Sequence, residues 1–464
     1  MTNLCIRDLV EITGGRLQLG AMPPLGGELE PLGRVVVDCQ QVRPGDVYWS
    51  LDRGAGDDAF PEEAFARSAL GVVTAGRRVE PWAGKFAIQV EDSRAALRQL
   101  VRAVRCRFTG FVVAVAGHTG KTTTAAWIEA ALAARGPGFR PDASSSAKFD
   151  PRTLLELTAE HRFGVFEMSA DVPVEFTEQA QWISPHGAVL VNAADAWDDS
   201  PDVARAADQI QALRDALPSH GTLVVNGDDE VLARALPRSS DQILRIGRST
   251  RCDWSASHIK LSDGWLGFVV DGTQLCVRAA GRHQLIPALA AYAVGRLAGI
   301  PAAELARRLA DVESPHRTCR MASRQGITVL ADWPRSRPAA ARAALAALRD
   351  FPAQGRRIVV AGDMFRDHVH RQQITRQYGD AAVAGYGADM IVSYGPTAEC
   401  LIASARAAGL SQRHTTAVSR MDEAAECLRN WCQPGDAVLV TGSTADESEE
   451  LAKRLLLAGE SAAA

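Results

Sequence analysis

The sequence predicts an α/β protein built from three domains. In two long blocks, one after residue 110 and one after residue 317, apolar strands alternate with helices. Such alternation is typical of parallel sheets that are covered by helices. The first hundred residues lack this regularity, and a chain of 464 residues is long enough for two to four domains. We therefore expect domains over 1–107, 108–316 and 317–464.

The N-terminal block predicts a small mixed α/β domain. Short β-branched or aromatic runs indicate strands, and glycine and proline interrupt the rest of the block. The expected strands cover 34–38, 71–74 and 86–89. The expected helices cover 61–69 and 93–105.

The middle block predicts a parallel sheet followed by a small antiparallel patch. The expected strands cover 111–116, 163–167, 187–192, 222–226 and 243–246, with a helix over 203–216. Alternating residues and turn signals over 252–277 favour an antiparallel meander. Helices over 286–298 and 301–311 are expected to complete the domain.

The C-terminal block repeats the alternation and predicts a Rossmann-like domain. The expected strands cover 327–331, 357–361, 390–394 and 437–441, and the expected helices include 337–350 and 421–431. The block contains no Gly-x-Gly-x-x-Gly, so its architecture alone does not imply a dinucleotide.

Composition excludes several classes of protein. The formal net charge is −4 and no block of lysine or arginine occurs, which argues against nucleic acid as a partner. No apolar run is long enough to span a bilayer, and the first residues do not resemble a signal peptide. The nine cysteines form no Cys-x-x-Cys pair. Reduced thiols, and hence a cytoplasmic location, are expected.

The most informative segment joins an expected strand to an expected helix. It reads Gly117-His118-Thr119-Gly120-Lys121-Thr122-Thr123, and we call these seven residues the phosphate loop. Glycines let the backbone approach phosphate oxygens, and the helix N-terminus favours negative charge. Lys121 would add a point charge, and the Thr122 hydroxyl would contact Mg²⁺. Only five lysines occur among 51 basic residues. We therefore predict a site for ATP and Mg²⁺, and not a structural turn that happens to contain a lysine.

Further segments, in their order along the chain, resemble the Mur ligases, which form amide bonds in peptidoglycan precursors. Val35–Val47 looks like the family's uridine-binding segment, and Phe166–Ser169 and Val189–Asn192 look like two of its strand ends. The other matching segments are Leu223–Asp229, Gly281–His283, Arg320–Met321 with Asp332, Arg356–Met364 and Gly435–Ser443. The resemblance covers nearly the whole chain.

The resemblance implies an ATP-dependent ligase that acts through an acyl phosphate. Glu167 would hold a second Mg²⁺, as an oxygen ligand suited to that ion. The further catalytic candidates are His283, Arg320 and Asp332, beside Lys121. Within the family, the sequence is most similar to the enzymes that add D-Ala-D-Ala to a UDP-linked muramoyl peptide. The resemblance therefore implies a UDP-linked muramoyl peptide and a D-Ala-D-Ala-like acceptor as partners. Cell-wall synthesis proteins are further candidate partners.

Several polar positions depart from the family pattern. Trp197 stands where the family has a metal-binding histidine, and the adjacent Asp198 and Asp199 are either replacement ligands or a solvated acidic turn. Asp208 would stand in for the family's carbamoylated lysine, and Pro287 replaces its adenine-contacting asparagine.

The substrate motifs depart as well. The uridine motif becomes Asp38-Cys39-Gln40, the motif after Asp332 keeps only its final Pro338, and Lys-Gly-Ser-Arg becomes Thr441-Gly-Ser-Thr444. Because each lost metal or oxyanion contact costs roughly 100-fold in rate, two alternatives stay open. One is an ATP-binding relative with impaired catalysis and a scaffold or regulatory role in cell-wall synthesis. The other is a nucleotide hydrolase whose domains close as a clamp.

Overall fold

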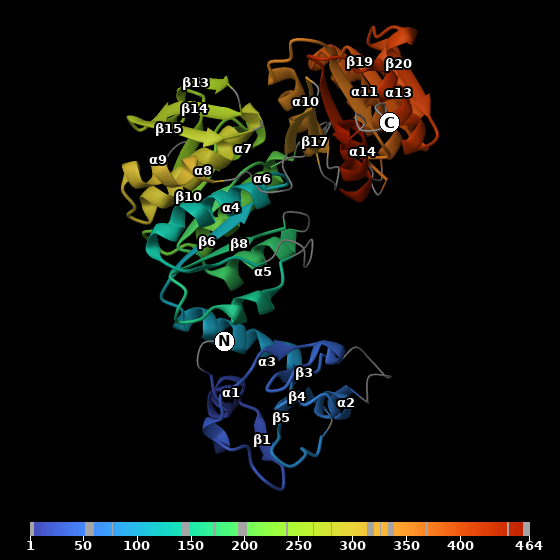
Figure 1. Ribbon diagram of the computed structural model, residues 1–464. Coiled ribbons are helices and arrows are strands. Elements are labelled where there is room, and N and C mark those ends of the chain that lie inside the picture. Colours follow the sequence, from blue (N-terminus) through green and yellow to red (C-terminus); the bar gives the residue numbers. More distant parts are fainter. Residues whose placement is uncertain are drawn as a thin grey trace.

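The computed structural model describes most of the chain. The described residues are 4–51, 60–76, 78–141, 149–169, 173–193, 202–237, 240–262, 264–279, 281–312, 320–324, 326–332, 338–366, 370–442 and 445–457. The chain forms three α/β units that follow one another in space in the order of the sequence (Figure 1). In the described part no helix is long and apolar enough to cross a membrane.

The N-terminal unit is a five-stranded sheet with the order β1-β5-β4-β3-β2. Strand β1 pairs antiparallel with β5, and the other neighbours are parallel. Its strands are β1 (Arg16–Leu19), β2 (Val35–Val36), β3 (Val47–Trp49), β4 (Gly71–Ala75) and β5 (Phe86–Val90). Its helices are α1 (Ile6–Thr13), η1 (Gly27–Leu29), η2 (Cys39–Gln41), α2 (Phe60–Ala66) and α3 (Ser93–Arg107).

Helix α3 connects the first unit to the second. Asp92 caps its N-terminus by accepting hydrogen bonds from the backbone of Arg94 and Ala95. Leu100 and Val104 of α3 are fully buried and belong to one apolar core that contains residues of both units. The buried Arg105 donates from Nε to the carbonyl oxygen of Ile183 at 2.7 Å. The helix is therefore a packed part of both units.

The middle unit contains a seven-stranded parallel sheet with the order β12-β11-β10-β9-β6-β8-β7. Its strands are β6 (Phe111–Ala116), β7 (Gly138–Phe139), β8 (Phe163–Glu167), β9 (Gly187–Leu190), β10 (Thr222–Asn226), β11 (Ile243–Gly247) and β12 (Trp254–Ser255). An antiparallel sheet of β13 (Ser257–Ser262), β14 (Trp265–Val270) and β15 (Thr273–Arg278) follows, which confirms the expected meander.

Helices cover both faces of the seven-stranded sheet. The helices and helical turns of this unit are α4 (Lys121–Leu132), η3 (Ala133–Arg135), η4 (Pro151–Glu156), α5 (Pro173–Ile183), α6 (Val203–Ala216), α7 (Glu230–Ala235), η5 (Arg282–Gln284), α8 (Leu285–Leu297) and α9 (Ala302–Ala310). One core holds α4, α8, α9 and the antiparallel sheet, whereas α5 and α6 belong to the core shared with α3. Because both faces are covered, β6 reads as a continuous apolar run.

The C-terminal unit is a six-stranded sheet with the order β16-β17-β21-β18-β19-β20, in which only β16 is antiparallel to its neighbour. Its strands are β16 (Arg320–Arg324), β17 (Ile327–Asp332), β18 (Arg357–Ala361), β19 (Met390–Tyr394), β20 (Thr415–Val418) and β21 (Ala437–Thr441). Its helices are α10 (Pro338–Asp350), α11 (Arg371–Asp380), η6 (Ala381–Gly385), α12 (Ala398–Ala407), η7 (Gln412–His414), α13 (Met421–Trp431) and α14 (Ala445–Leu457).

The strand order explains how these helices are distributed. The chain moves in one direction across the sheet from β17 to β20 and then returns to β21. Because parallel crossovers are right-handed, α10, α11 and α12 pack on one face, and α13 and α14 pack on the other. The predicted α/β fold class, with its parallel middle sheet and doubly wound C-terminal sheet, is confirmed.

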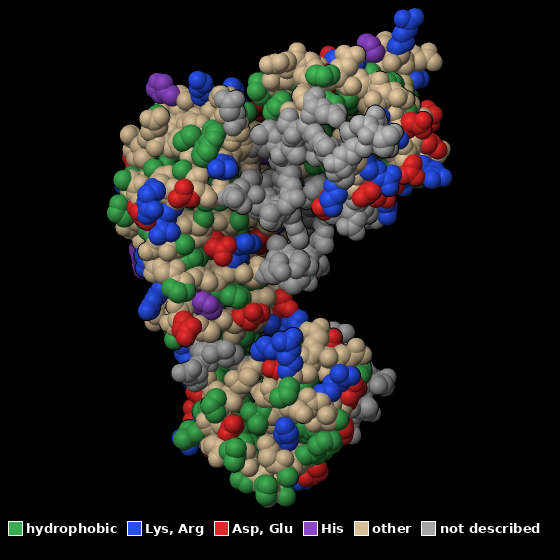
Figure 2. Space-filling view, in the orientation of Figure 1, with side chains coloured by type: hydrophobic (Ala, Val, Ile, Leu, Met, Phe, Trp, Pro, Cys, Tyr) green, Lys and Arg blue, Asp and Glu red, His purple; other side chains and the backbone are tan. Residues whose placement is uncertain are grey.

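The charged side chains of the described surface are mixed in sign. Figure 2 shows acidic and basic side chains interspersed over one face of the molecule, in the N-terminal unit as well as in the two units that follow it. This mixture agrees with the small net charge of the chain.

Candidate functional site: the phosphate loop

The phosphate loop leaves β6 after Ala116 and enters α4 at Lys121. Both of its glycines have positive φ, +143° at Gly117 and +77° at Gly120, a region that L side chains rarely adopt. At Gly117 a Cβ atom would also lie 3.2 Å from the backbone nitrogen of Asn192. The loop therefore requires glycine at both positions for its conformation. At Gly117 it also requires glycine because the backbone of Asn192 lies so close.

The ammonium group of Lys121 lies directly over the loop. Its Nζ donates to the carbonyl oxygen of Gly117 at 2.7 Å and to that of His118 at 3.4 Å. These contacts hold a positive charge at the N-terminal end of α4, where the helix dipole also favours an anion. This is the position at which the sequence predicts the lysine charge.

The two predicted metal ligands are neighbours in the structure. The Thr122 hydroxyl donates to Oε2 of Glu167 at 2.9 Å, which joins the first turn of α4 to the end of β8. A hydroxyl and a carboxylate are hard oxygen donors, and Mg²⁺ commonly takes only one or two carboxylates together with phosphate oxygens and water. These two side chains are therefore close enough to share one Mg²⁺, whereas the sequence predicts a separate ion for each. Within the described residues no group of three or more His, Cys, Asp or Glu residues is placed to hold a metal.

The remaining loop residues contribute through the backbone. The Thr123 side chain is buried within α4, and the Thr124 hydroxyl donates to the carbonyl oxygen of Gly120 at 2.8 Å. The backbone N–H groups of the first helical turn have no acceptor within the helix. These N–H groups and the loop amides are the groups that are predicted to bind phosphate.

In the sequence, Asn192 belongs to a segment that resembles a strand end of the Mur ligases, and no role is predicted for it. In the structure its Oδ1 accepts from the backbone nitrogens of His118 at 2.7 Å and Thr119 at 3.1 Å. Its Nδ2 donates to the Thr119 carbonyl oxygen and to Thr119 Oγ1, both at 3.0 Å. Thus a side chain from the segment that follows β9 holds the middle of the loop. The expected strand over 187–192 is wrong at its end, because β9 stops at Leu190.

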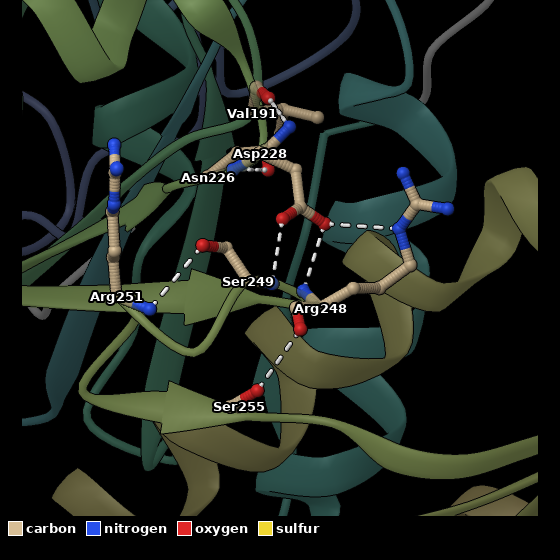
Figure 3. Close-up of polar contacts among 7 residues, drawn as sticks. All are labelled: Val191, Asn226, Asp228, Arg248, Ser249, Arg251 and Ser255. Carbon is tan, nitrogen blue, oxygen red and sulfur yellow. Dashed lines mark hydrogen bonds and ion pairs between the residues drawn. The ribbon is translucent and has the colours of Figure 1, made fainter.

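A second polar cluster follows β10 at the same edge of the sheet. Asp228 accepts at Oδ2 from the backbone nitrogen of Arg248 at 2.8 Å and at Oδ1 from that of Ser249 at 3.0 Å (Figure 3). Arg248 also forms an ion pair of 3.3 Å with the same carboxylate. Asp228 therefore fixes the turn after β11 and is already engaged by its own domain.

The predicted catalytic residue His283 lies in η5, which packs against α10 of the C-terminal unit. The space around the neighbouring Gly281 shows how close this packing is. A Cβ atom added at Gly281 would lie 2.8 Å from Nδ1 of His283 and 3.1 Å from Cβ of Ala347 in α10. Burial lowers the pKa of His283 to about 4, and Asp350 of α10 opposes this shift. The side chain of His283 is therefore packed between the middle and C-terminal units, and its lowered pKa keeps it neutral at pH 7.

The structure describes only some of the residues that stand at the family's metal-binding and adenine-contacting positions. Pro287, at the family's asparagine position, is buried in α8. Asp208 lies on the exposed side of α6. Trp197, Asp198 and Asp199 lie outside the described residues. Of the predicted metal-binding residues and their substitutes, the structure therefore brings together only the described side chains of Thr122 and Glu167.

Two further candidates are placed by their backbone. Arg320 begins β16 and pairs with Ala331 of β17. Asp332 ends β17, in register with Thr441 of β21. Their side chains lie outside the described part of the chain. Asp332 thus stands at the C-terminal edge of a parallel sheet, where ligands of such folds usually bind.

The fold and this loop together define a class: three-domain α/β proteins with a phosphate-binding loop in the middle sheet. Two neighbouring stretches of the chain match sequence models of one family. Residues 115–295 match "Mur ligase middle domain", and residues 316–444 match "Mur ligase, glutamate ligase domain". The chain belongs to the Mur ligase family, as the resemblance of its motifs predicted.

Relatives and solved structures agree with this assignment over most of the chain. The UDP-N-acetylmuramoyl-tripeptide–D-alanyl-D-alanine ligase of Bacillus subtilis is 23% identical, over 86% of this chain and 87% of the relative. A crystal structure of MurF from Acinetobacter baumannii superposes with a TM-score of 0.80 at 20% identity, over 98% and 99% of the two chains. The MurF ligase of Thermotoga maritima in complex with ADP gives 0.75 at 21% identity, over 91% and 97%. The shared three-domain fold is therefore established.

Proposed function

We propose that this chain is an ATP-dependent ligase that forms an amide bond in peptidoglycan precursor synthesis, with a UDP-linked muramoyl peptide as donor and a D-Ala-D-Ala-like acceptor. The observation that carries the proposal is the phosphate loop, where the Lys121 ammonium and the Thr122–Glu167 oxygen pair lie at one helix N-terminus. A relative that covers most of the chain bears this activity in its name.

In the proposed reaction ATP supplies a phosphoryl group to the donor carboxylate, and the acceptor amine then displaces phosphate from the resulting acyl phosphate. Charge develops on the transferred phosphoryl oxygens, so positioned cations contribute most of the catalysis. Lys121 would hold the phosphates, and Thr122 and Glu167 would hold Mg²⁺, which neutralises phosphate charge. His283, Arg320 and Asp332 remain the further catalytic candidates.

A second candidate function is an ATP-binding relative with impaired catalysis and a scaffold or regulatory role. It is favoured by the metal site, where the described contacts bring one carboxylate, that of Glu167, to the Thr122 hydroxyl, and where Asp208 is exposed on its helix. The family reaction normally uses more ligands than this. Losing one such contact costs about 3 kcal/mol of transition-state stabilisation, or roughly 100-fold in rate.

The two functions are separated by one reconstituted reaction. The purified chain is mixed with Mg·ATP, UDP-muramoyl tripeptide and D-Ala-D-Ala, and both phosphate and the UDP-linked pentapeptide are measured. The ligase proposal expects both products in equal amounts. Mg·ATP binding without amide formation would support the impaired relative, and phosphate release that does not depend on the peptide would support a nucleotide hydrolase. A chain that neither binds nor hydrolyses Mg·ATP would overturn all three.

A further inference from the structure

Asn192 is placed to control the shape of the phosphate loop, although it belongs to a different strand connection. Four hydrogen bonds of 2.7 to 3.1 Å connect its amide group to His118 and Thr119. Both polar atoms of the side chain are used, the oxygen as an acceptor and the nitrogen as a donor. The contact spans more than 70 positions in the sequence, because β9 lies beside β6 in the parallel sheet.

The position of Asn192 is itself fixed by its neighbours in the sheet. The backbone nitrogen of Val191 donates to the carbonyl oxygen of Ala116, the last residue of β6, at 3.0 Å. The carbonyl oxygen of Val191 accepts from Nδ2 of Asn226 at 2.9 Å, and Asn226 Oδ1 accepts from the backbone nitrogen of Asp228 (Figure 3). The side chain of Asn192 therefore projects from a backbone that is held on both sides.

The backbone donors of the loop divide into two groups. Those of His118 and Thr119 already donate to a single oxygen, Oδ1 of Asn192. The donors of the first turn of α4 have no acceptor within the helix. An incoming phosphate therefore meets a loop whose middle is already held in place, with its remaining donors directed along the helix axis.

We propose that Asn192 is a positioning residue for the nucleotide phosphates: its amide holds the phosphate loop in the binding conformation before the nucleotide arrives. The proposal rests on the proposed function, since it requires that the loop binds a nucleotide. Without this amide, the His118 and Thr119 nitrogens would lose their acceptor, and the loop would have to be ordered during binding. Ordering a loop on binding lowers affinity even where every direct contact is kept.

The test combines Mg·ADP titration with amide hydrogen exchange of the loop. Asn192→Ala removes both the acceptor and the donor, and we expect at least 10-fold weaker Mg·ADP binding and faster exchange confined to His118 and Thr119. Asn430→Ala, on the exposed side of α13, is the matched control and should change neither quantity. Exchange that rises throughout β6 would indicate general destabilisation and would overturn the proposal.

A second variant keeps the proposal testable if Asn192→Ala does not fold. Asn192→Asp retains the oxygen that accepts from the two loop nitrogens, so their exchange should stay slow. Its added negative charge beside the phosphates should still weaken Mg·ADP binding at least 10-fold. If Asn192→Ala binds Mg·ADP as tightly as the unaltered chain, or if His118 and Thr119 exchange quickly in Asn192→Asp although the accepting oxygen is kept, the positioning role is refuted while the ligase proposal stands. If the unaltered chain itself binds no Mg·ADP, both fail.

Discussion

Thr122 and Glu167 lie 45 positions apart in the sequence, yet the threonine hydroxyl donates a 2.9 Å hydrogen bond to the glutamate carboxylate. The contact arises because β8 is the parallel neighbour of β6, so that the end of one strand meets the loop that follows the other. It identifies the two oxygen donors at which Mg²⁺ would be held beside the phosphates.

Replacing Glu167 by Gln should therefore impair the metal-dependent step. The amide keeps the size and much of the hydrogen bonding of the carboxylate but removes its charge. We expect turnover of Mg·ATP to fall by about 100-fold or more. Phosphate release, measured across a magnesium titration, checks the prediction. Glu399→Gln, at an exposed position of α12, is the control. An unchanged magnesium dependence would exclude Glu167 as a metal ligand.

Replacing Lys121 by Ala should abolish most nucleotide binding. The variant loses the ammonium that lies 2.7 Å from the Gly117 carbonyl oxygen, and with it the positive charge in the loop. We expect an affinity for Mg·ATP lower by about 3 kcal/mol, or roughly 100-fold, by isothermal titration. Lys453→Ala removes an exposed lysine that pairs with Glu449, and it should bind like the unaltered chain. Equal affinities for the two variants would contradict the assigned role of Lys121.

The central strands of the middle and C-terminal sheets could be predicted closely from the sequence. The expected ranges 111–116, 163–167 and 222–226 agree with β6, β8 and β10 as the structure has them. Buried parallel strands carry apolar runs that end at glycine or polar residues, so both of their ends are marked. The same holds for β18 and β21 in the C-terminal sheet.

Short edge strands and the N-terminal unit were predicted less well. Strands β7 and β12 have only two residues each, too few to show any periodicity. Helix α1 was missed because its N-cap is Cys5, which is outside the usual set of capping residues. In these places the neighbouring structure, and not the local pattern, determines the conformation of the chain.

The candidate site was predictable where its residues adjoin in the sequence. The phosphate loop is one continuous motif, whereas the role of Asn192 depends on which strands are neighbours in the sheet. The only signal in the sequence was an asparagine at the end of the strand expected over 187–192, and the neighbours of that strand were not predicted. The domain boundaries at 107 and 316, and the roles of Arg320 and Asp332, stay predictions.

The same arrangement of a turn, a buried aspartate and an arginine occurs in the N-terminal and the C-terminal unit. In each, a Pro-Gly-Asp turn with glycine at positive φ, Gly45 at +87° and Gly435 at +96°, precedes a buried strand. The aspartate that follows is nearly inaccessible, 3% exposed for Asp46 and 2% for Asp436. Each aspartate accepts from the backbone and the side chain of an arginine that immediately precedes the neighbouring strand, Arg34 before β2 and Arg356 before β18. These contacts hold β3 to β2 in the N-terminal unit and β21 to β18 in the C-terminal unit.

Asp436 should make the C-terminal unit sensitive to acid. Burial by itself would raise the pKa of Asp436, but hydrogen bonds from the side chain and backbone of Arg356 and the backbone of Gln433 outweigh it, so the pKa is held below its ordinary value. A lowered pKa means that the carboxylate stabilises the fold above the unfolded-state pKa of about 4. This stabilisation is lost as the pH falls below that value.

Asp436→Asn should therefore lower the free energy of unfolding at pH 7 by about 2 kcal/mol. The difference between variant and unaltered chain should shrink as the pH falls below about 4. Urea unfolding followed by circular dichroism at several pH values measures both effects. Asp241→Asn, at an exposed position, supplies the comparison. A difference that does not vary with pH would show that the charge of Asp436 contributes nothing.

His283 should also link stability to pH, over a different range. Burial lowers its pKa to about 4, below the value of about 6.5 expected in the unfolded chain. Between these two values the unfolded chain binds more protons, so stability should decrease as the pH falls from about 6.5 to about 4, by at most about 3 kcal/mol. Above a pH of about 6.5 the histidine is neutral in both states and contributes no pH dependence.

His283→Gln should flatten this part of the stability profile, whereas His414→Gln, at an exposed position, should leave it unchanged. Because η5 packs against α10, the docking of the C-terminal unit should weaken with the same pH dependence in the unaltered chain. Unfolding curves between about pH 4 and 8 test the first expectation, and small-angle scattering over the same range tests the second. If the variant instead keeps the stability profile but loses ligase turnover, His283 acts in catalysis and not in domain packing.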